Sequence, residues 1–299
     1  MKIFITGGMG FIGSYIVMDL LNSGHEVSIL ARNPDKIPEF RKKPGISIVQ
    51  GELADFDTIA KNLPGHDAAV HNALYWGNTP TEMLHNDTRC SVHFFDLCTE
   101  AGIKQVIYTS STATMGEFRP DMNELTVPRP TDFYGATKTA TEAYLLAFGS
   151  KTPMRCNVVR PGYTIGNPVV PGAHIYSDKR FKQIVAAALK NEEIKLTKND
   201  GTQFIWAGDL AKIYTAILHS SVNRQIYFGL SQNFTSWEAI ATQTIAMTGS
   251  KSKIVLEDKG YADQPNLFDL SKIERDFGLA FDSTRTISEH LRYLISEVK

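Results

Sequence analysis

The sequence predicts an α/β fold, in which a doubly wound parallel sheet carries helices on both faces and a smaller, mostly helical C-terminal part follows. Short apolar runs alternate with helix-length amphipathic stretches through the first half of the chain, which is typical of a parallel sheet. The right-handed crossover rule makes the doubly wound order the simplest topology. A chain of 299 residues, 42% of them apolar, is long enough for one large or two unequal domains.

The first elements follow one another closely. Residues 2–6 are a short apolar run bounded by glycine and read as a buried strand. Residues 11–23 carry apolar side chains at helical spacing and stop at a glycine. Apolar runs at 26–32 and 46–51 predict the second and third strands, and 57–63 predicts a helix that ends before a proline.

The same alternation continues toward the middle of the chain. Residues 67–73 read as the fourth strand, 86–101 as a helix closed by a glycine, and 104–111 as the fifth strand. A helix over 134–148 and a strand over 155–162 complete this part.

The pattern loosens beyond residue 162. The proline-rich stretch 163–176 predicts a binding loop. Helices are expected near 178–190 and 208–219, and the strand 225–229 is expected to return to the main sheet. The remainder predicts small helices with one short strand near 252–257.

These elements predict two domains. A Rossmann-type dinucleotide-binding domain takes residues 1–162 and about 205–232, and a substrate-binding domain takes about 163–204 and 233–299.

A glycine turn joins the first strand to the first helix in the run TGGMGFIG, residues 6–13. Between a strand and a helix, three glycines at this spacing predict a dinucleotide site. Gly7 permits the tight turn, Gly10 lets the backbone approach a pyrophosphate, and Gly13 allows close helix packing. The N–H groups at the start of the helix, at Phe11 and Ile12, then face the phosphates.

The end of the second strand predicts which dinucleotide is bound. An acidic residue there binds the ribose 2′-hydroxyl of NAD, whereas an arginine accommodates the 2′-phosphate of NADP. This chain has Arg32, with no carboxylate until Asp35. NADP is therefore favoured over NAD.

A catalytic group is predicted on the helix that begins near residue 134. Tyr134 and Lys138 are four residues apart and share one helix face. A neighbouring ammonium favours the phenolate, so Lys138 is expected to lower the tyrosine pKa. A serine or threonine hydroxyl from the run 108–112, at the end of the fifth strand, would hold the substrate oxygen.

With these motifs in place, the sequence resembles the extended short-chain dehydrogenase/reductase superfamily, the NAD-dependent epimerase/dehydratase group, over nearly its whole length. The matching segments are TGGMGFIG, HNA (71–73), SSTATMG (110–116), YGATK (134–138), RPGYTIG (160–166) and GDLAK (208–212). The resemblance implies that Ser111 is the catalytic hydroxyl, in preference to Ser110. It also implies that Tyr134 is the acid–base and that Lys138 contacts the nicotinamide ribose. Further cofactor contacts are implied for Leu53, Ala73, Thr109 and Pro161.

The sequence departs from some branches of this family. Nucleotide-sugar epimerases usually carry asparagine where this chain has Tyr163, and arginine near the position of Gln203. Glutamine cannot replace a bidentate guanidinium at a diphosphate. Dehydratases place an Asp–Glu pair after the catalytic hydroxyl, whereas Thr112 and Ala113 stand here. A nucleotide-sugar substrate is therefore disfavoured, and NADPH-dependent reduction of small or aromatic carbonyl compounds stays open beside epimerisation.

Composition bounds the remaining possibilities. A net charge of −1 gives no electrostatic reason to expect nucleic acid or a membrane as partner. The three cysteines show neither pairing nor metal spacing, and the eight histidines show no ligand pair, so a cytoplasmic protein without a metal is expected. The resemblance implies a homodimer. A non-catalytic, dinucleotide-binding redox sensor is the rival from another class.

Overall fold

The computed structural model describes residues 1–176, 178–263 and 267–298. They contain a seven-stranded sheet in the order β3-β2-β1-β4-β5-β6-β11, with every neighbouring pair parallel. The strands are β1 Lys2–Thr6, β2 Glu26–Ala31, β3 Ile46–Gln50, β4 Ala68–His71, β5 Gln105–Thr109, β6 Arg155–Pro161 and β11 Ile226–Gly229. The predicted doubly wound sheet is confirmed, and β11 joins it beside β6 as expected.

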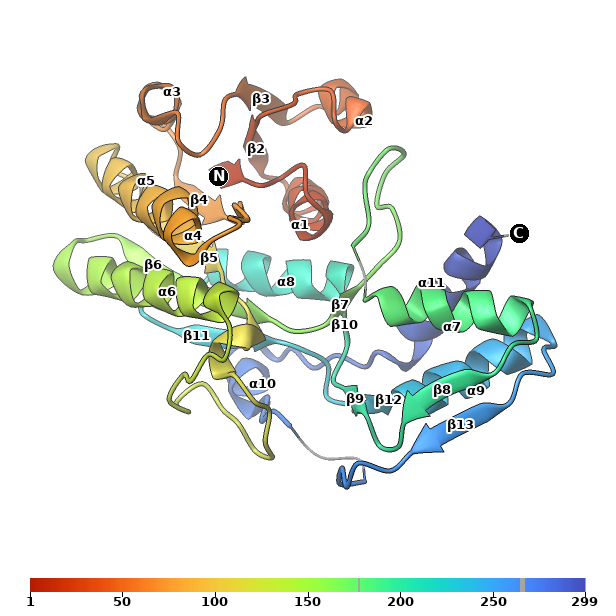
Figure 1. The fold of residues 1–299 in the computed structure, drawn as a ribbon. Helices are drawn as coiled ribbons and strands as arrows, with labels where there is room; N and C mark the ends of the chain where they lie inside the picture. Colours follow the sequence, from red (N-terminus) through yellow and green to blue (C-terminus); the bar gives the residue numbers. More distant parts are fainter. Residues whose placement is uncertain (177, 264–266, 299) are drawn as a thin grey trace.

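Helices cover both faces of this sheet (Figure 1). Helices α1 (Phe11–Asn22) and α8 (Ala207–Leu218) pack on one face, and α3 (Phe56–Asn62), α5 (Arg89–Glu100) and α6 (Phe133–Lys151) pack on the other. Successive side chains of β1 point to opposite faces of the sheet. Ile3 and Ile5 join the cluster with α1 and α8, whereas Phe4 joins the opposite cluster.

A third hydrophobic cluster lies in the C-terminal part, where Figure 1 shows α7, α9 and α11 gathered beside β8 and β13. Its helices are α7 Lys179–Leu189, α9 Trp237–Thr248 and α11 Thr284–Val298, and its strands are β8 Ile194–Thr197 and β13 Ile254–Glu257. The cluster fits the predicted mostly helical C-terminal part. The exact domain boundaries stay a prediction.

Short elements complete the chain. Strand β7 Thr164–Ile165 pairs with β10 Ile205–Trp206, and β9 Gly201–Thr202 pairs with β12 Thr235–Ser236. The helix α10 Ser271–Phe277 packs near β11.

The structure corrects three details of the sequence prediction. The helix expected at 86–101 begins earlier, because Thr79 caps α4 (Pro80–Met83) and a π-helical turn, Leu84–Thr88, leads into α5. The short helix α2 (Pro38–Lys42) was not predicted. Strand β8 was missed as well; its partner β13 was expected near 252–257, and the two form a separate small sheet. No helix among the described residues is long and apolar enough to cross a membrane.

Candidate functional site

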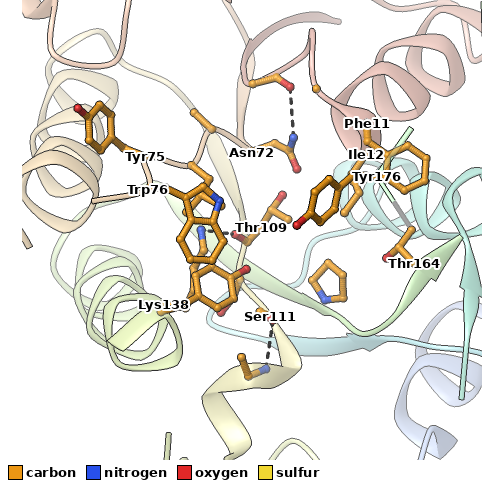
Figure 2. A pocket seen from close by; sticks show the side chains of 18 of the residues that line it. Phe11, Ile12, Asn72, Tyr75, Trp76, Thr109, Ser111, Lys138, Thr164 and Tyr176 are labelled. Atoms are coloured by element: carbon orange, nitrogen blue, oxygen red, sulfur yellow. Dashed lines mark hydrogen bonds between the residues drawn. The ribbon is translucent and has the colours of Figure 1, made fainter. Parts of the chain in front are cut away.

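A cavity of about 1240 Å³ opens along the carboxyl ends of the parallel strands. The glycine turn, the ends of β2 and β5, the segment after β4, the start of α6 and the loop after β6 all contribute to its walls (Figure 2). A volume above the usual ~300–1,000 Å³ of a small-molecule pocket can hold a dinucleotide together with a substrate.

The glycine turn forms a cradle at one end of this cavity. Gly7 has a φ of +73°, and its carbonyl oxygen accepts a hydrogen bond of 2.9 Å from the N–H of Gly10. A Cβ at Gly13 would collide with the carbonyl oxygen of Gly7, so α1 can pack this closely only because glycine stands there. No side chain caps the start of α1 at Gly10, which leaves its first N–H groups available for an anion.

Almost all of the predicted cofactor residues line this one cavity. They are Gly7, Gly10, Phe11, Ile12, Arg32, Leu53, Ala73, Thr109, Tyr134, Lys138 and Pro161. Gly13 lies beneath the turn, where it has the packing role expected of it. Arg32 is exposed at the end of β2, and Lys36 lines the same cavity. Arg32 and Lys36 are thus two cations in the cavity lining, which also includes the carboxylate of Glu52.

The three predicted catalytic residues meet near the opposite end. Asp132 caps α6 by accepting a 2.6 Å hydrogen bond from the N–H of Gly135. A Cβ at Gly135 would collide with the carbonyl oxygen of Ala113, so the start of α6 sits directly on the turn that follows Ser111. This close packing brings Ser111 within hydrogen-bonding reach of Tyr134. One turn further along α6, Lys138 Nζ donates to the carbonyl oxygen of Thr109 at 3.3 Å.

The proton equilibria of this group differ from the sequence expectation. Burial raises the pKa of Tyr134, the hydrogen bond with Ser111 opposes that rise, and the carboxylates of Asp87 and Asp132 add to it. The pKa of Tyr134 is therefore raised overall, whereas the sequence predicted that Lys138 would lower it. Burial also lowers the pKa of Lys138, against the influence of Asp87. A buried phenol stays protonated at neutral pH, which suits a proton donor.

Aromatic side chains surround the catalytic group. The ring of Trp76 stacks on that of Tyr134, with centroids 5.0 Å apart and an interplanar angle of 24°. Figure 2 shows Trp76 near Lys138 on one side of the pocket and Tyr176 projecting into it from the other. Tyr75 and Trp76, which follow β4, both line the cavity. Tyr176 was missed, because an aromatic residue in a loop carries no pattern.

Tyr163 and Gln203 stand at the two positions where nucleotide-sugar epimerases usually carry asparagine and arginine, and the structure places these two residues in different surroundings. Tyr163 lines the cavity, and its ring packs edge-on against Phe204. Gln203 is buried away from the cavity. Its amide nitrogen donates to the carbonyl oxygens of Ser231 and Phe268, and its amide oxygen accepts from the N–H of Phe268. Gln203 thus has a structural role, and it cannot contact a substrate in the cavity.

The strand-end histidine is fully satisfied within the core. His71 hydrogen-bonds the hydroxyls of Thr6 at 2.7 Å and Ser91 at 2.8 Å. Burial lowers the pKa of His71 to about 3, so the ring is neutral. Among the described residues, no group of three or more histidine, cysteine or carboxylate side chains could hold a metal ion.

Comparison with known protein families shows to which family the chain belongs. A profile of the NAD dependent epimerase/dehydratase family matches residues 3–228. The chain belongs to this family. That membership confirms the resemblance inferred from the motifs.

Similar proteins point to more than one activity. A 3 beta-hydroxysteroid dehydrogenase/Delta 5-->4-isomerase of Mycobacterium tuberculosis is 28% identical over 63% of this chain and 53% of its own length. A UDP-glucose 4-epimerase of Streptococcus mutans is 29% identical over 58% of each chain. This chain thus spans little more than half the length of these relatives. The structure of a UDP-glucuronic acid 4-epimerase from Bacillus cereus, in complex with NAD, has a TM-score of 0.83 at 18% identity and covers 100% of both chains. At that identity it supports the fold alone.

Proposed function

We propose that the protein is an NADP-preferring oxidoreductase that reduces the carbonyl group of a small or aromatic molecule. The observation that carries this proposal is the convergence of Ser111, Tyr134 and Lys138 on the cavity that also contains the glycine turn. A non-catalytic sensor has no need of this group, and the family membership further supports an enzyme.

The chain's own residues divide the work in the following way. The glycine turn and the start of α1, which line the cavity, would hold the pyrophosphate, and Arg32 would lie beside the adenosine ribose. When bound, the nicotinamide supplies the hydride. Ser111 hydrogen-bonds the substrate oxygen, and Tyr134 donates its phenolic proton to that oxygen as negative charge develops there. Lys138 provides the positive charge that stabilises the resulting phenolate.

The raised pKa of Tyr134 favours the reductive direction. A reductase begins its cycle with the phenol protonated, and burial keeps it so at neutral pH. We therefore expect reduction to proceed steadily through neutral pH and to decline only as the pH rises through the pKa of Tyr134.

The walls of the pocket support an uncharged, flat substrate. Trp76, Tyr163 and Tyr176 present aromatic surface to the cavity. Arg180, whose guanidinium lies 5.9 Å from the centre of the Tyr163 ring, is already engaged by the carboxylates of Asp178 and Asp200. Lys179 lines the cavity as well, but an ammonium offers only a point charge. Aromatic walls stack on flat rings, whereas a diphosphate calls for a free guanidinium.

The direct test is oxidation of NADPH in the presence of aromatic aldehydes, aromatic ketones and a steroid ketone, followed by absorbance. We expect substrate-dependent oxidation with at least one of these compounds. No turnover with any of them, combined with tight NADPH binding, would favour the redox sensor.

Replacement of Arg32 by alanine is expected to weaken NADPH binding by about 10- to 100-fold, because a charge-assisted contact to the 2′-phosphate is lost. NADH affinity should change little. Fluorescence titration of both cofactors measures the effect, and Arg41→Ala serves as control, since Arg41 is exposed and paired with Asp35 outside the cavity. Equal affinity of the wild type for NADPH and NADH would contradict the cofactor assignment.

Nucleotide sugars are expected to bind weakly, with dissociation constants above about 1 mM. The reason is that neither Tyr163 nor the buried Gln203 supplies a guanidinium for a diphosphate, and Lys179, which lines the cavity, offers only a single ammonium. Isothermal titration with UDP-glucose, UDP-galactose and dTDP-glucose tests this expectation, with NADPH as positive control. Micromolar affinity for any of the three would restore the epimerase as the better assignment.

A further inference from the structure

A buried carboxylate lies behind the catalytic lysine. Asp87 belongs to the π-helical turn Leu84–Thr88 and is 0% exposed. Its Oδ2 atom accepts no hydrogen bond from the described residues and lies 4.0 Å from Lys138 Nζ, which is itself 3% exposed. A charge this deeply buried is costly unless an opposite charge faces it. π-helical turns are rare and often mark functional sites.

The other atoms of Asp87 fix its position. Oδ1 accepts a 3.0 Å hydrogen bond from the N–H of Tyr75, in the segment that carries Trp76. The carbonyl oxygen of Asp87 accepts from the Ser91 hydroxyl at 2.7 Å. Asp87 thus contacts both the segment after β4, through the N–H of Tyr75, and the ammonium of Lys138. Trp76, from the same segment, stacks on Tyr134.

The other groups around Lys138 leave Asp87 as its counter-charge. Glu142, one turn further along α6, is engaged by both nitrogens of a bidentate contact with Arg160, at 2.9 and 2.7 Å. His71 is neutral, because burial lowers its pKa to about 3. Tyr108 on β5 presents its ring face 4.9 Å from Lys138 Nζ, and the Tyr134 ring lies at 5.8 Å.

We propose that Asp87 is a positioning residue, which keeps the buried Lys138 ammonium charged and anchors the Tyr75–Trp76 segment over Tyr134. The role of Lys138 in turnover rests on the function proposed above, whereas the pairing of Asp87 with Lys138 does not.

The direction of the effect follows from the buried charges. Burial lowers the pKa of Lys138, whereas the carboxylate of Asp87 and, to a smaller extent, that of Glu142 raise it. Without the Asp87 carboxylate, Lys138 loses its proton at a lower pH. At the alkaline end of the pH range in which the enzyme works, the positive charge that stabilises the Tyr134 phenolate is then absent. Asp87 also raises the pKa of Tyr134 directly, so its removal lowers the pKa of the phenol at every pH where Lys138 is still charged.

The pairing can be measured without cofactor or substrate. Acetic anhydride acylates a lysine only as the free amine, so competitive labelling across pH, read by mass spectrometry, gives the midpoint of Lys138. In Asp87→Asn the midpoint should fall, and the labelled fraction of Lys138 at neutral pH should rise by about tenfold or more, the usual effect of losing an opposite charge within ~4–6 Å. Rates are normalised to the plateau at high pH, which corrects for any change in access.

Two further variants complete the measurement. Asp87→Glu retains the charge and should keep the midpoint close to that of the wild type. Asp96→Asn removes an exposed carboxylate from α5 and should leave the midpoint unchanged. An unaltered Lys138 midpoint in a folded Asp87→Asn protein would overturn the proposal.

Activity supplies the second readout. The alkaline limb of carbonyl reduction should move to lower pH in Asp87→Asn and return toward the wild-type position in Asp87→Glu. A structural role alone would change the stability and leave the pH profile in place. If labelling responds while Tyr134→Phe retains full turnover, the pairing stands and the proposed function fails.

Discussion

Replacing Tyr134 with phenylalanine is expected to lower the turnover number by about 10²–10⁴, the usual contribution of a positioned acid–base group. The phenylalanine ring can keep its stacking contact with Trp76, because only the hydroxyl is removed. NADPH affinity should therefore stay close to that of the wild type.

The pH profile gives this prediction a sharper readout. Reduction by the wild type should decline as the pH rises through the raised pKa of Tyr134, and the residual activity of Tyr134→Phe should lack that decline. Tyr144→Phe is the matched control, since Tyr144 lies on the same helix and is 53% exposed. A Tyr134→Phe enzyme with wild-type turnover and an unshifted profile would show that this tyrosine only packs.

Replacing Lys138 with methionine should have three consequences. The affinity for NADPH should fall, since the ammonium is proposed to contact the ribose. The alkaline limb of activity should move to higher pH, because the charge that favours the phenolate is gone. The free energy of unfolding should also fall, on the order of 3 kcal/mol, because the buried carboxylate of Asp87 loses its counter-charge.

A double variant separates the loss of stability from the effects on NADPH affinity and on the pH profile. Lys138→Met with Asp87→Asn removes both charges, so it should recover most of the lost stability in denaturant titrations while turnover stays low. If Lys138→Met alone unfolds at the wild-type denaturant concentration, the two charges do not interact.

The main sheet and the cofactor-binding end of the site could be predicted from the sequence, because both are encoded by short local patterns. Each strand of the main sheet is a short apolar run, and the glycine spacing follows from a turn in which Gly7 needs a positive φ and Gly13 leaves no room for a Cβ. Tyr134 and Lys138 could be paired because four residues on a helix fix their common face.

Other features depend on contacts between distant segments, which leave no local pattern. Asp87 comes to face Lys138 only because the π-helical turn packs against α6. The sequence suggested that Gln203 takes the place of a substrate-binding arginine, whereas the fold turns its amide toward the backbone of Ser231 and Phe268. The expected lowering of the Tyr134 pKa failed because the spacing of two residues says nothing of how deeply they are buried.

Tyr134 is proposed to complete the reduction of a carbonyl group at the nicotinamide end of this cavity. The test is to incubate the protein with [4,4-²H₂]NADPH and a responsive aromatic ketone and to analyse the product by mass spectrometry, because either face of the nicotinamide then transfers deuterium. We expect one deuterium at the carbinol carbon with the wild type, and about 10²-fold less labelled product, or lower still, with Tyr134→Phe. Absence of deuterium from the product, or equal labelling by both proteins, would contradict it.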